Sequence, residues 1–231
     1  MKKVVITQSN YIPWKGYFDA IAGVDECILY DDVQYTRRDW RNRNQIKTPA
    51  GLQWLTVPVQ VKGKFEQRIQ DVFIDSVDWS NDHLKAFHQN YKRSKFFDEI
   101  YSLMENEYAK NNFVKLSELN RHFIQVICSY LKIDTKITSS SEYQLVDGKT
   151  ERLVSICQQT NATEYISGPA ARNYLDESLF KNAGIALKWL DYSGYQNYPQ
   201  LWGDFVHQVT ILDLLFNCGS DSRDYMKFSQ Y

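Results

Sequence analysis

The sequence predicts an α/β fold, because apolar runs alternate with helical segments in two parts of the chain. A β-branched run at Lys3–Thr7 precedes a short helical segment at Lys15–Ala22, and a second strand-like run follows at Glu26–Tyr30. Helix and strand alternate again between Thr150 and Leu190. Such alternation is typical of parallel sheets, so we expect a mostly parallel, Rossmann-like sheet. The pattern between these two portions is helical and predicts a middle layer of helices.

Two further strands are expected before this helical layer. Gln53–Val61 is a strand-like run that carries Pro58, which implies an edge position or a bulge because proline cannot donate a ladder hydrogen bond. Ile69–Ile74 is the other predicted strand.

The helical layer begins at Asp78, with Ser80 or Asn81 as the expected cap. Its predicted helices are His83–Asn90, Phe96–Asn106 and Val114–Leu131. We expect one domain over residues 1–231, with residues 78–135 as a possible helical insertion or subdomain.

The last third of the chain is expected to complete the α/β pattern after a polar break at Thr138–Ser141. Helices are predicted at Thr150–Gln159, Arg172–Asn182 and Phe205–Asn217, and strands at Glu164–Ser167 and Ile185–Leu190. Thr150 is the expected cap of its helix, and Gly219 the expected stop of the last helix.

The composition of the chain argues against nucleic-acid-binding, secreted and membrane-spanning classes of protein. The chain of 231 residues is 43% hydrophobic and 24% charged, and its net charge of −1 makes nucleic acid an unlikely main partner. Its four cysteines form no close pair, which indicates a reducing compartment. Neither a signal peptide nor a membrane span is expected from the apolar runs. We therefore expect a cytoplasmic protein.

Short motifs for phosphate or metal binding are incomplete in this chain. Gly148-Lys149-Thr150 resembles the end of a P-loop, but Tyr143 stands where that motif needs its first glycine. His83 and His88 are five residues apart rather than the four that place two ligands on one helix face. No metal site is predicted.

The first candidate for a site is Gln8–Phe18, which follows the first predicted strand. Open α/β sheets bind ligands at the carboxyl ends of their strands. Gln8 and Asn10 can orient polar groups, Trp14 and Tyr17 offer flat faces, and Gly16 would allow close approach of a ligand. An ordinary βα turn with aromatic packing would also account for these residues.

A pair of carboxylates follows the second predicted strand. Asp31 and Asp32 repel each other unless they are solvated, paired or used in chemistry, and Gln34 and Tyr35 follow them. We expect Asp31, Asp32 and Gln34 to be catalytic and Tyr35 to contact substrate. A solvated strand end is the alternative.

The segment Arg37–Lys47 is strongly basic, with five cations and one acid. Arginine binds phosphate or carboxylate bidentately, so this composition favours recognition of an anion such as a diphosphate. The residues predicted to contact substrate here are Trp40, Arg41, Asn42, Arg43, Asn44 and Lys47. A solvated basic loop or a site for single-stranded nucleic acid are the alternatives.

A second candidate site lies at Tyr165–Tyr174, a strand end followed by a turn of small residues and a helix start. Ser167 and Gly168 are expected to contact substrate there, because helix N-termini attract anions. Capping of the helix by Ser167 would also explain the pattern.

These motifs, taken together, resemble the WbqC-like protein family. The matching segments are Gln8–Phe18, Asp31–Tyr35, Arg41–Lys47, Trp54–Val59, Ile166–Gly168 and Asp213–Gly219. They occur in order over nearly the whole chain. Ser9 stands where the family commonly has proline, which leaves the local turn geometry open.

The resemblance implies a role in the synthesis of O-antigen or other surface polysaccharides. We expect an enzyme that transfers an acyl or aminoacyl group to a nucleotide-linked amino sugar, with a nucleotide sugar or another phosphorylated small molecule as its partner. No tightly bound cofactor is expected, although an acyl donor or ATP with Mg²⁺ could serve as co-substrate. One alternative is an ATP-dependent nucleotidyltransferase or ligase, whose adenylyltransferase-like first βα turn would hold the triphosphate. The other is a non-catalytic binding protein in polysaccharide assembly. A homodimer is also possible.

Overall fold

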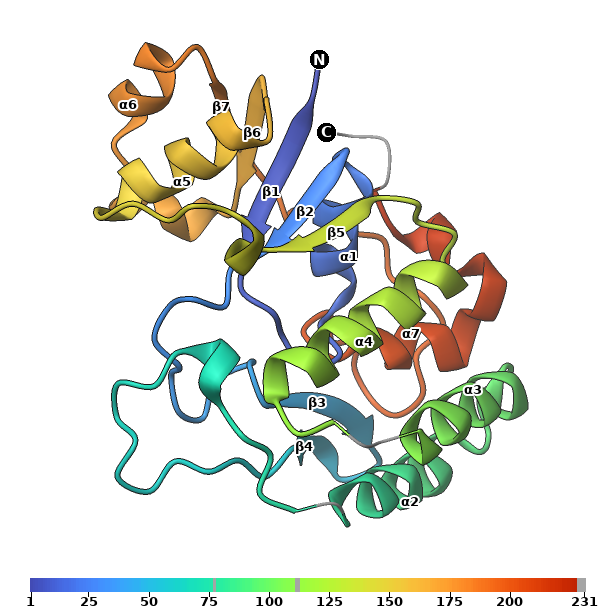
Figure 1. Ribbon diagram of the computed structural model, residues 1–231. Coiled ribbons are helices and arrows are strands. Elements are labelled where there is room, and N and C mark those ends of the chain that lie inside the picture. The colour runs from blue at the N-terminus through green and yellow to red at the C-terminus, as the bar shows by residue number, and fades with distance from the viewer. Residues whose placement is uncertain (77, 111–112, 228–231) are drawn as a thin grey trace.

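The computed structural model describes residues 1–76, 78–110 and 113–227, and its centre is a parallel sheet of five strands (Figure 1). The strand order is β5-β2-β1-β6-β7. The strands are β1 (Lys3–Thr7), β2 (Glu26–Leu29), β5 (Lys136–Ser139), β6 (Glu164–Ser167) and β7 (Ala186–Trp189). All four neighbouring pairs are parallel. The predicted α/β class with a mostly parallel sheet is confirmed.

The direction in which the chain builds the sheet reverses between β1 and β6. From β1 the chain adds β2 and β5 on one side, and it then crosses to add β6 and β7 on the other. Val5 of β1 is therefore paired with Cys27 on one side and with Ile166 on the other. Such a reversal leaves a crevice at the carboxyl ends of the two central strands, because their connections leave in opposite directions.

Helices cover both faces of the sheet. The helices are α1 (Lys15–Ala22), α2 (Trp79–Tyr91), α3 (Phe97–Ala109), α4 (Leu116–Tyr130), α5 (Lys149–Gln159), α6 (Glu177–Asn182) and α7 (Ile211–Cys218). Successive side chains of a strand point to opposite faces. Val5 accordingly packs with α1, α4 and α7, whereas Val4 and Ile6 pack with α5 and α6. Figure 1 shows α5 and α6 beside β6 and β7, apart from the other helices.

The predicted helical layer consists of α2, α3 and α4, and their apolar side chains join the same hydrophobic core as Val5 and Leu29 of the sheet. The expected cap of α2 is wrong. Ser80 and Asn81 lie inside the first turn, and Asp78 occupies the cap position without a side-chain hydrogen bond.

An antiparallel hairpin lies beyond the carboxyl ends of the sheet strands (Figure 1). It pairs β3 (Arg43–Thr48) with β4 (Gly51–Thr56). β3 was not expected, and β4 replaces the first part of the predicted strand at Gln53–Val61. The predicted strand at Ile69–Ile74 is wrong, because Ile69–Asp71 forms a 3-10 helix and only Phe73 and Ile74 make isolated bridges.

Several expectations in the last third need correction. The polar segment Thr138–Ser141 contains the end of β5. The predicted helix at Arg172–Asn182 is divided into a 3-10 helix at Pro169–Asn173 and α6. Gly148, with φ of 91°, occupies the cap of α5, and Thr150 Oγ1 instead accepts the N–H of Asp176 at 3.2 Å.

The last helix begins later than predicted but ends as expected. Thr210 caps α7 by accepting the N–H of Leu212, so the helix starts at Ile211 rather than Phe205. Gly219 ends it with φ of 52°, a conformation that favours glycine. A side chain there would also collide with the Phe96 ring, 2.2 Å from the position of an added Cβ.

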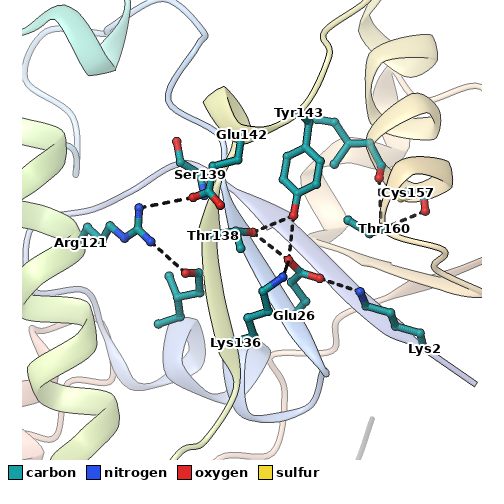
Figure 2. A network of polar contacts seen from close by, with 12 residues as sticks. Lys2, Glu26, Arg121, Lys136, Thr138, Ser139, Glu142, Tyr143, Cys157 and Thr160 are labelled. Carbon is teal, nitrogen blue, oxygen red and sulfur yellow. Dashed lines mark hydrogen bonds and ion pairs between the residues drawn. The ribbon is translucent and has the colours of Figure 1, made fainter.

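An ion cluster around the buried carboxylate of Glu26 ties the edge strand β5 to the rest of the sheet (Figure 2). Glu26 on β2 is 1% exposed, and its carboxylate pairs with Lys2 at 2.7 Å and with Lys136 at 3.0 Å. Tyr143 donates a hydrogen bond to it at 2.7 Å. Burial alone would raise the pKa of Glu26, but the bonds from Lys2, Tyr143 and Lys136 together lower it to about 2.

We predict that Glu26→Gln lowers the free energy of unfolding at pH 7 by about 3 kcal/mol, because the pKa of the carboxyl falls from 4.5 to about 2 on folding. Because folding lowers the pKa of Glu26, its ionised carboxylate stabilises the fold above pH 4.5, and that stabilisation is lost as the pH falls toward 2. Urea titrations across this pH range should show the free energy of unfolding of the wild type approaching that of the variant as the pH falls. A constant difference between the two proteins would contradict the assignment.

Candidate functional site

The loop between β1 and α1 leaves the sheet at its reversal point and adopts a strained conformation. Ile12 has φ of 39°, which is unusual for a β-branched side chain and costs about 1–3 kcal/mol. Such a conformation persists only where surrounding contacts impose it. Strained backbone is frequent at functional sites, so this loop is a candidate for function.

Buried polar side chains hold the loop from two directions. Asn44 on β3 donates through Nδ2 to the carbonyls of Tyr11 at 3.2 Å and Ile12 at 2.8 Å. Thr210, the cap of α7, donates its hydroxyl to the same Ile12 carbonyl at 2.7 Å. The N–H of Tyr11 donates to the carbonyl of Trp40 at 3.0 Å. Asn44, predicted to bind substrate, thus uses its side chain to fix the loop.

Asp31 fixes the start of the same loop. Its carboxylate, 4% exposed, accepts the backbone N–H of Ser9 at 2.9 Å. Burial raises the pKa of Asp31, while the Ser9 hydrogen bond acts in the opposite direction. Asn120 on α4, which is fully buried, donates to the Ser9 hydroxyl at 3.1 Å and to the carbonyl of Arg41 at 2.9 Å. These contacts connect the loop, β2, α4 and the basic segment.

The other predicted catalytic residues are also held by protein groups. Asp32 accepts the hydroxyl of Ser140 and lies 3.9 Å from a guanidinium nitrogen of Arg68. Gln34 donates through Nε2 to the carbonyl of Phe65 at 2.9 Å. Asp31 lines a polar cavity of about 350 Å³ that also contains Arg121 and Lys115. Catalysis by Asp31, Asp32 and Gln34 therefore stays a prediction.

A larger cavity, which we call the switch-point cavity, lies at the carboxyl ends of β1 and β6. It has a volume of about 570 Å³. Four predicted residues line it, namely Gln8, Arg41, Ser167 and Gly168. They come from both sides of the sheet reversal, so the two candidate segments of the sequence meet here. Ser167 is buried, and Gly168, not Ser167, holds the cap position of the following 3-10 helix.

Arg41 is the best-defined cation of the switch-point cavity. Its side chain is 14% exposed, and its guanidinium donates to Asn10 Oδ1 and lies 3.7 Å from Asp39. Its Nε atom is buried without a hydrogen-bond partner among the described residues. Burial lowers the pKa of Arg41, and the neighbouring carboxylate of Asp39 acts in the opposite direction. Arginine keeps its charge in proteins, so it can hold an anion here.

A second cavity, which we call the aromatic cavity, is lined by Asn10, the hydrogen-bond partner of Arg41. Its volume is about 510 Å³, and Asn10, Pro13, Trp14, Trp40, Asn44, Tyr192 and Gln208 line it. Asn10 lines the aromatic cavity and bonds Arg41, which lines the switch-point cavity, so the two spaces are neighbours. The predicted residues Asn10, Trp14, Trp40 and Asn44 are brought together here.

The predicted basic clamp does not close around one point. Arg43 stacks on Trp54, with its guanidinium 4.0 Å from the ring centre, and donates to the carbonyl of Arg38. Lys47 is buried and donates to Gln200 Oε1 at 2.8 Å and to the carbonyl of Asp204. Alternation along β3 does not explain this division. Arg43 and Lys47 each lie two residues from Gln45 and so belong to the same face of the strand, but their charged ends meet different partners.

Four other predicted residues serve the packing of this region. An added Cβ at Gly16 would lie 2.4 Å from the indole of Trp14, so the glycine makes room for that ring rather than for a ligand. Tyr17 is buried and donates its hydroxyl to the carbonyl of Gln8 at 3.0 Å. Asn42 is buried and donates to the carbonyl of Val57 at 2.8 Å. The ring of Tyr35 is buried in the core.

Sequence reasoning missed several lining residues. The switch-point cavity includes Tyr30, Lys149 and Tyr174, and the aromatic cavity includes Tyr192 and Gln208. Lys149 belongs to the Gly-Lys-Thr motif that lacks its first glycine, and the structure brings it to the cavity at the start of α5. Asn120 could have been identified from the sequence, because it is a polar residue within the apolar stripe of α4.

Within the described part of the chain, no group of three or more His, Cys, Asp or Glu side chains could hold a metal ion. None of the described helices combines the length and the apolar character needed to cross a bilayer.

We predict that Asp31→Ala lowers the free energy of unfolding by about 1–3 kcal/mol, because the N–H of Ser9 would be left buried and unpaired. Asp31→Asn keeps an oxygen that can accept this hydrogen bond, so its loss should be smaller. Chemical denaturation of both variants measures the difference. Equal losses for the two substitutions would show that the Ser9 contact does not hold the loop.

Comparison with known proteins agrees with the motifs that meet at this site. The chain is 55% identical over 228 residues to the uncharacterized protein Rv1507c of Mycobacterium tuberculosis (strain ATCC 25618 / H37Rv), and the match covers 99% of each chain. No solved structure matches the chain. The model of the WbqC-like protein family matches residues 8–225, which include both candidate segments. The chain therefore belongs to the WbqC-like protein family.

Proposed function

We propose that this protein is an enzyme of surface polysaccharide synthesis that binds a nucleotide-linked amino sugar and transfers an acyl or aminoacyl group to its amine. The observation that carries the proposal is the switch-point cavity. In doubly wound sheets nucleotides bind at such a reversal of strand order, at the carboxyl ends of the strands. The role in O-antigen synthesis rests on the family resemblance.

The lining of the switch-point cavity suits a nucleotide. Arg41 and Lys149 supply positive charge for phosphate groups. Tyr30 and Tyr174 supply aromatic surface, and Tyr174 is 58% exposed. Gly168 and the start of α5 bring backbone close to the cavity, where N–H groups at a helix N-terminus favour an anion.

The proposed reaction forms an amide bond, breaks the bond between the acyl carbon and its leaving group, and moves a proton from the amine to that leaving group. The amine nitrogen of the sugar attacks the carbonyl carbon of an activated acyl donor, and the bond from that carbon to the donor's leaving group breaks. A base must take the proton that the amine loses. Asp31 or Asp32 is the proposed base, although neither lines the switch-point cavity or the aromatic cavity, and the contact of Asp31 with Ser9 also gives it a positioning role in the loop.

An ATP-dependent nucleotidyltransferase or ligase is the second candidate. Such an enzyme would hold its triphosphate at the first βα turn, between β1 and α1. The indole of Trp14 covers Gly16 at that turn, so the space is occupied by protein. ATP with Mg²⁺ would instead have to bind in the switch-point cavity, where Arg41 and Lys149 lie. A non-catalytic binding protein would use the same cavity without turnover.

We predict that Arg41→Ala weakens the binding of nucleoside diphosphates by about 10- to 100-fold, the loss expected for a charged hydrogen bond. Isothermal calorimetry with UDP, GDP and dTDP, and with ATP and Mg²⁺, measures this effect. Arg37→Ala is the matched control, because Arg37 is exposed and stacks on Phe65 away from both cavities. Equal affinities for wild type and Arg41→Ala would remove Arg41 from the phosphate site.

Transfer itself should appear as a mass gain on the sugar nucleotide. We predict this product when the protein is incubated with an amino-sugar nucleotide and an acyl-coenzyme A or aminoacyl donor, with detection by mass spectrometry. Arg41→Ala should reduce its formation in parallel with binding. Tight nucleotide binding without product from any donor in the panel would favour the non-catalytic alternative, and release of pyrophosphate from ATP would favour the nucleotidyltransferase.

A further inference from the structure

The contact between Asn10 and Arg41 marks the boundary between two spaces of different chemistry. The switch-point cavity on one side contains Arg41 and Lys149. The aromatic cavity on the other side is lined by neutral residues, with Trp14, Trp40 and Tyr192 among them. The charged lining of the switch-point cavity favours a phosphate group. The neutral lining of the aromatic cavity does not, and it suits an uncharged ligand with flat or apolar faces.

The aromatic faces of the second cavity are fixed before any ligand binds. Trp40 is 39% exposed, and its ring centre lies 5.3 Å from that of Trp54, which carries the Arg43 guanidinium on it. Trp14 makes edge contacts with Tyr192 at 5.1 Å and with Tyr195 at 5.7 Å. Rings that are already held in place lose little conformational freedom when a ligand stacks on them.

The second cavity also offers amide groups beside its rings. Asn10 and Gln208 line it, and the amide of Gln208 is exposed. A pyranose ring presents C–H groups on its faces and hydroxyl groups around its edge. Indole faces and side-chain amides match these two kinds of group, and a volume of about 510 Å³ accommodates such a ring.

The positions of the two cavities relative to Arg41 determine which part of a nucleotide sugar each cavity would hold. In such a molecule a diphosphate separates the nucleoside from the sugar. A diphosphate at Arg41 lies at the boundary, with the switch-point cavity on one side and the aromatic cavity on the other. Because the nucleoside belongs at the sheet reversal, the sugar falls on the aromatic side.

We propose that the aromatic cavity is the sugar subsite, where a pyranose ring stacks on Trp40, while the diphosphate crosses the Asn10–Arg41 contact. This assignment rests on the proposed function and adds to it the place and the chemistry of sugar recognition. It makes Trp40 and Tyr192 determinants of which sugar is accepted, separate from the residues that hold the nucleotide.

Calorimetry with matched ligand pairs tests the sugar subsite. The pairs are UDP with UDP-N-acetylglucosamine, GDP with GDP-mannose, and dTDP with dTDP-glucose. For the preferred nucleotide, the wild type should bind the sugar nucleotide about tenfold more tightly than the diphosphate, the gain expected for one stacked ring with its hydrogen bonds. Trp40→Ala should remove this gain and leave the affinity for the diphosphate unchanged.

Two further variants exclude loss of folding as the explanation. Trp40→Phe keeps an aromatic face and should keep part of the gain. Phe65→Ala removes another exposed aromatic ring outside both cavities and should change neither affinity. Thermal melts of the three variants, each with and without diphosphate, verify that the nucleotide site is intact.

The outcomes separate this proposal from the function on which it rests. If diphosphates bind but the sugar adds no affinity, or if Trp40→Ala leaves the gain intact, the sugar subsite is wrong and the nucleotide site stands. If Trp40→Ala weakens diphosphates and sugar nucleotides equally, the aromatic cavity holds the nucleoside instead, which also overturns the proposal. If no ligand of the three pairs binds the wild type, both proposals are overturned.

Discussion

The hydrogen bond from the backbone of Ser9 to the buried carboxylate of Asp31 is the contact on which the site depends. It fixes the first residues after β1, at the reversal of the sheet. Asn120, Asn44 and Thr210 then hold the rest of the loop, including the strained backbone of Ile12. Since these groups are buried and hydrogen-bond to one another, a change in the loop would leave several more polar atoms without partners.

The fixed loop divides the space at the carboxyl ends of the strands. Gln8 faces the switch-point cavity, Asn10 faces the aromatic cavity, and Arg41 reaches Asn10 from the neighbouring segment. Positive charge thus lies on one side of the loop and neutral aromatic surface on the other. This separation is what a ligand with an anionic centre and an uncharged ring requires, and it arises from backbone geometry rather than from any single charged cluster.

The sequence predicted the central βαβ unit well, because Lys3–Thr7 and Lys15–Ala22 have clear apolar patterns that match β1 and α1. β3 and β5 were missed, since an edge strand or hairpin strand rich in Lys, Asn, Gln and Thr has no apolar pattern. Composition indicated the basic segment, but only tertiary structure shows that Lys47 is buried against Gln200 while Arg41 reaches a cavity. Charge along a sequence does not reveal which partner each side chain meets.

The most direct test of this account is a crystal structure of the protein with a bound sugar nucleotide, chosen as the one that binds most tightly. We expect the diphosphate within hydrogen-bond distance of the Arg41 guanidinium, with the loop from Gln8 to Trp14 unchanged and the Asp31–Ser9 bond intact. A diphosphate bound at Arg43 or Lys47 would contradict the assignment of Arg41, and a loop that rearranges to admit the ligand would show that Asp31 does not preform the site.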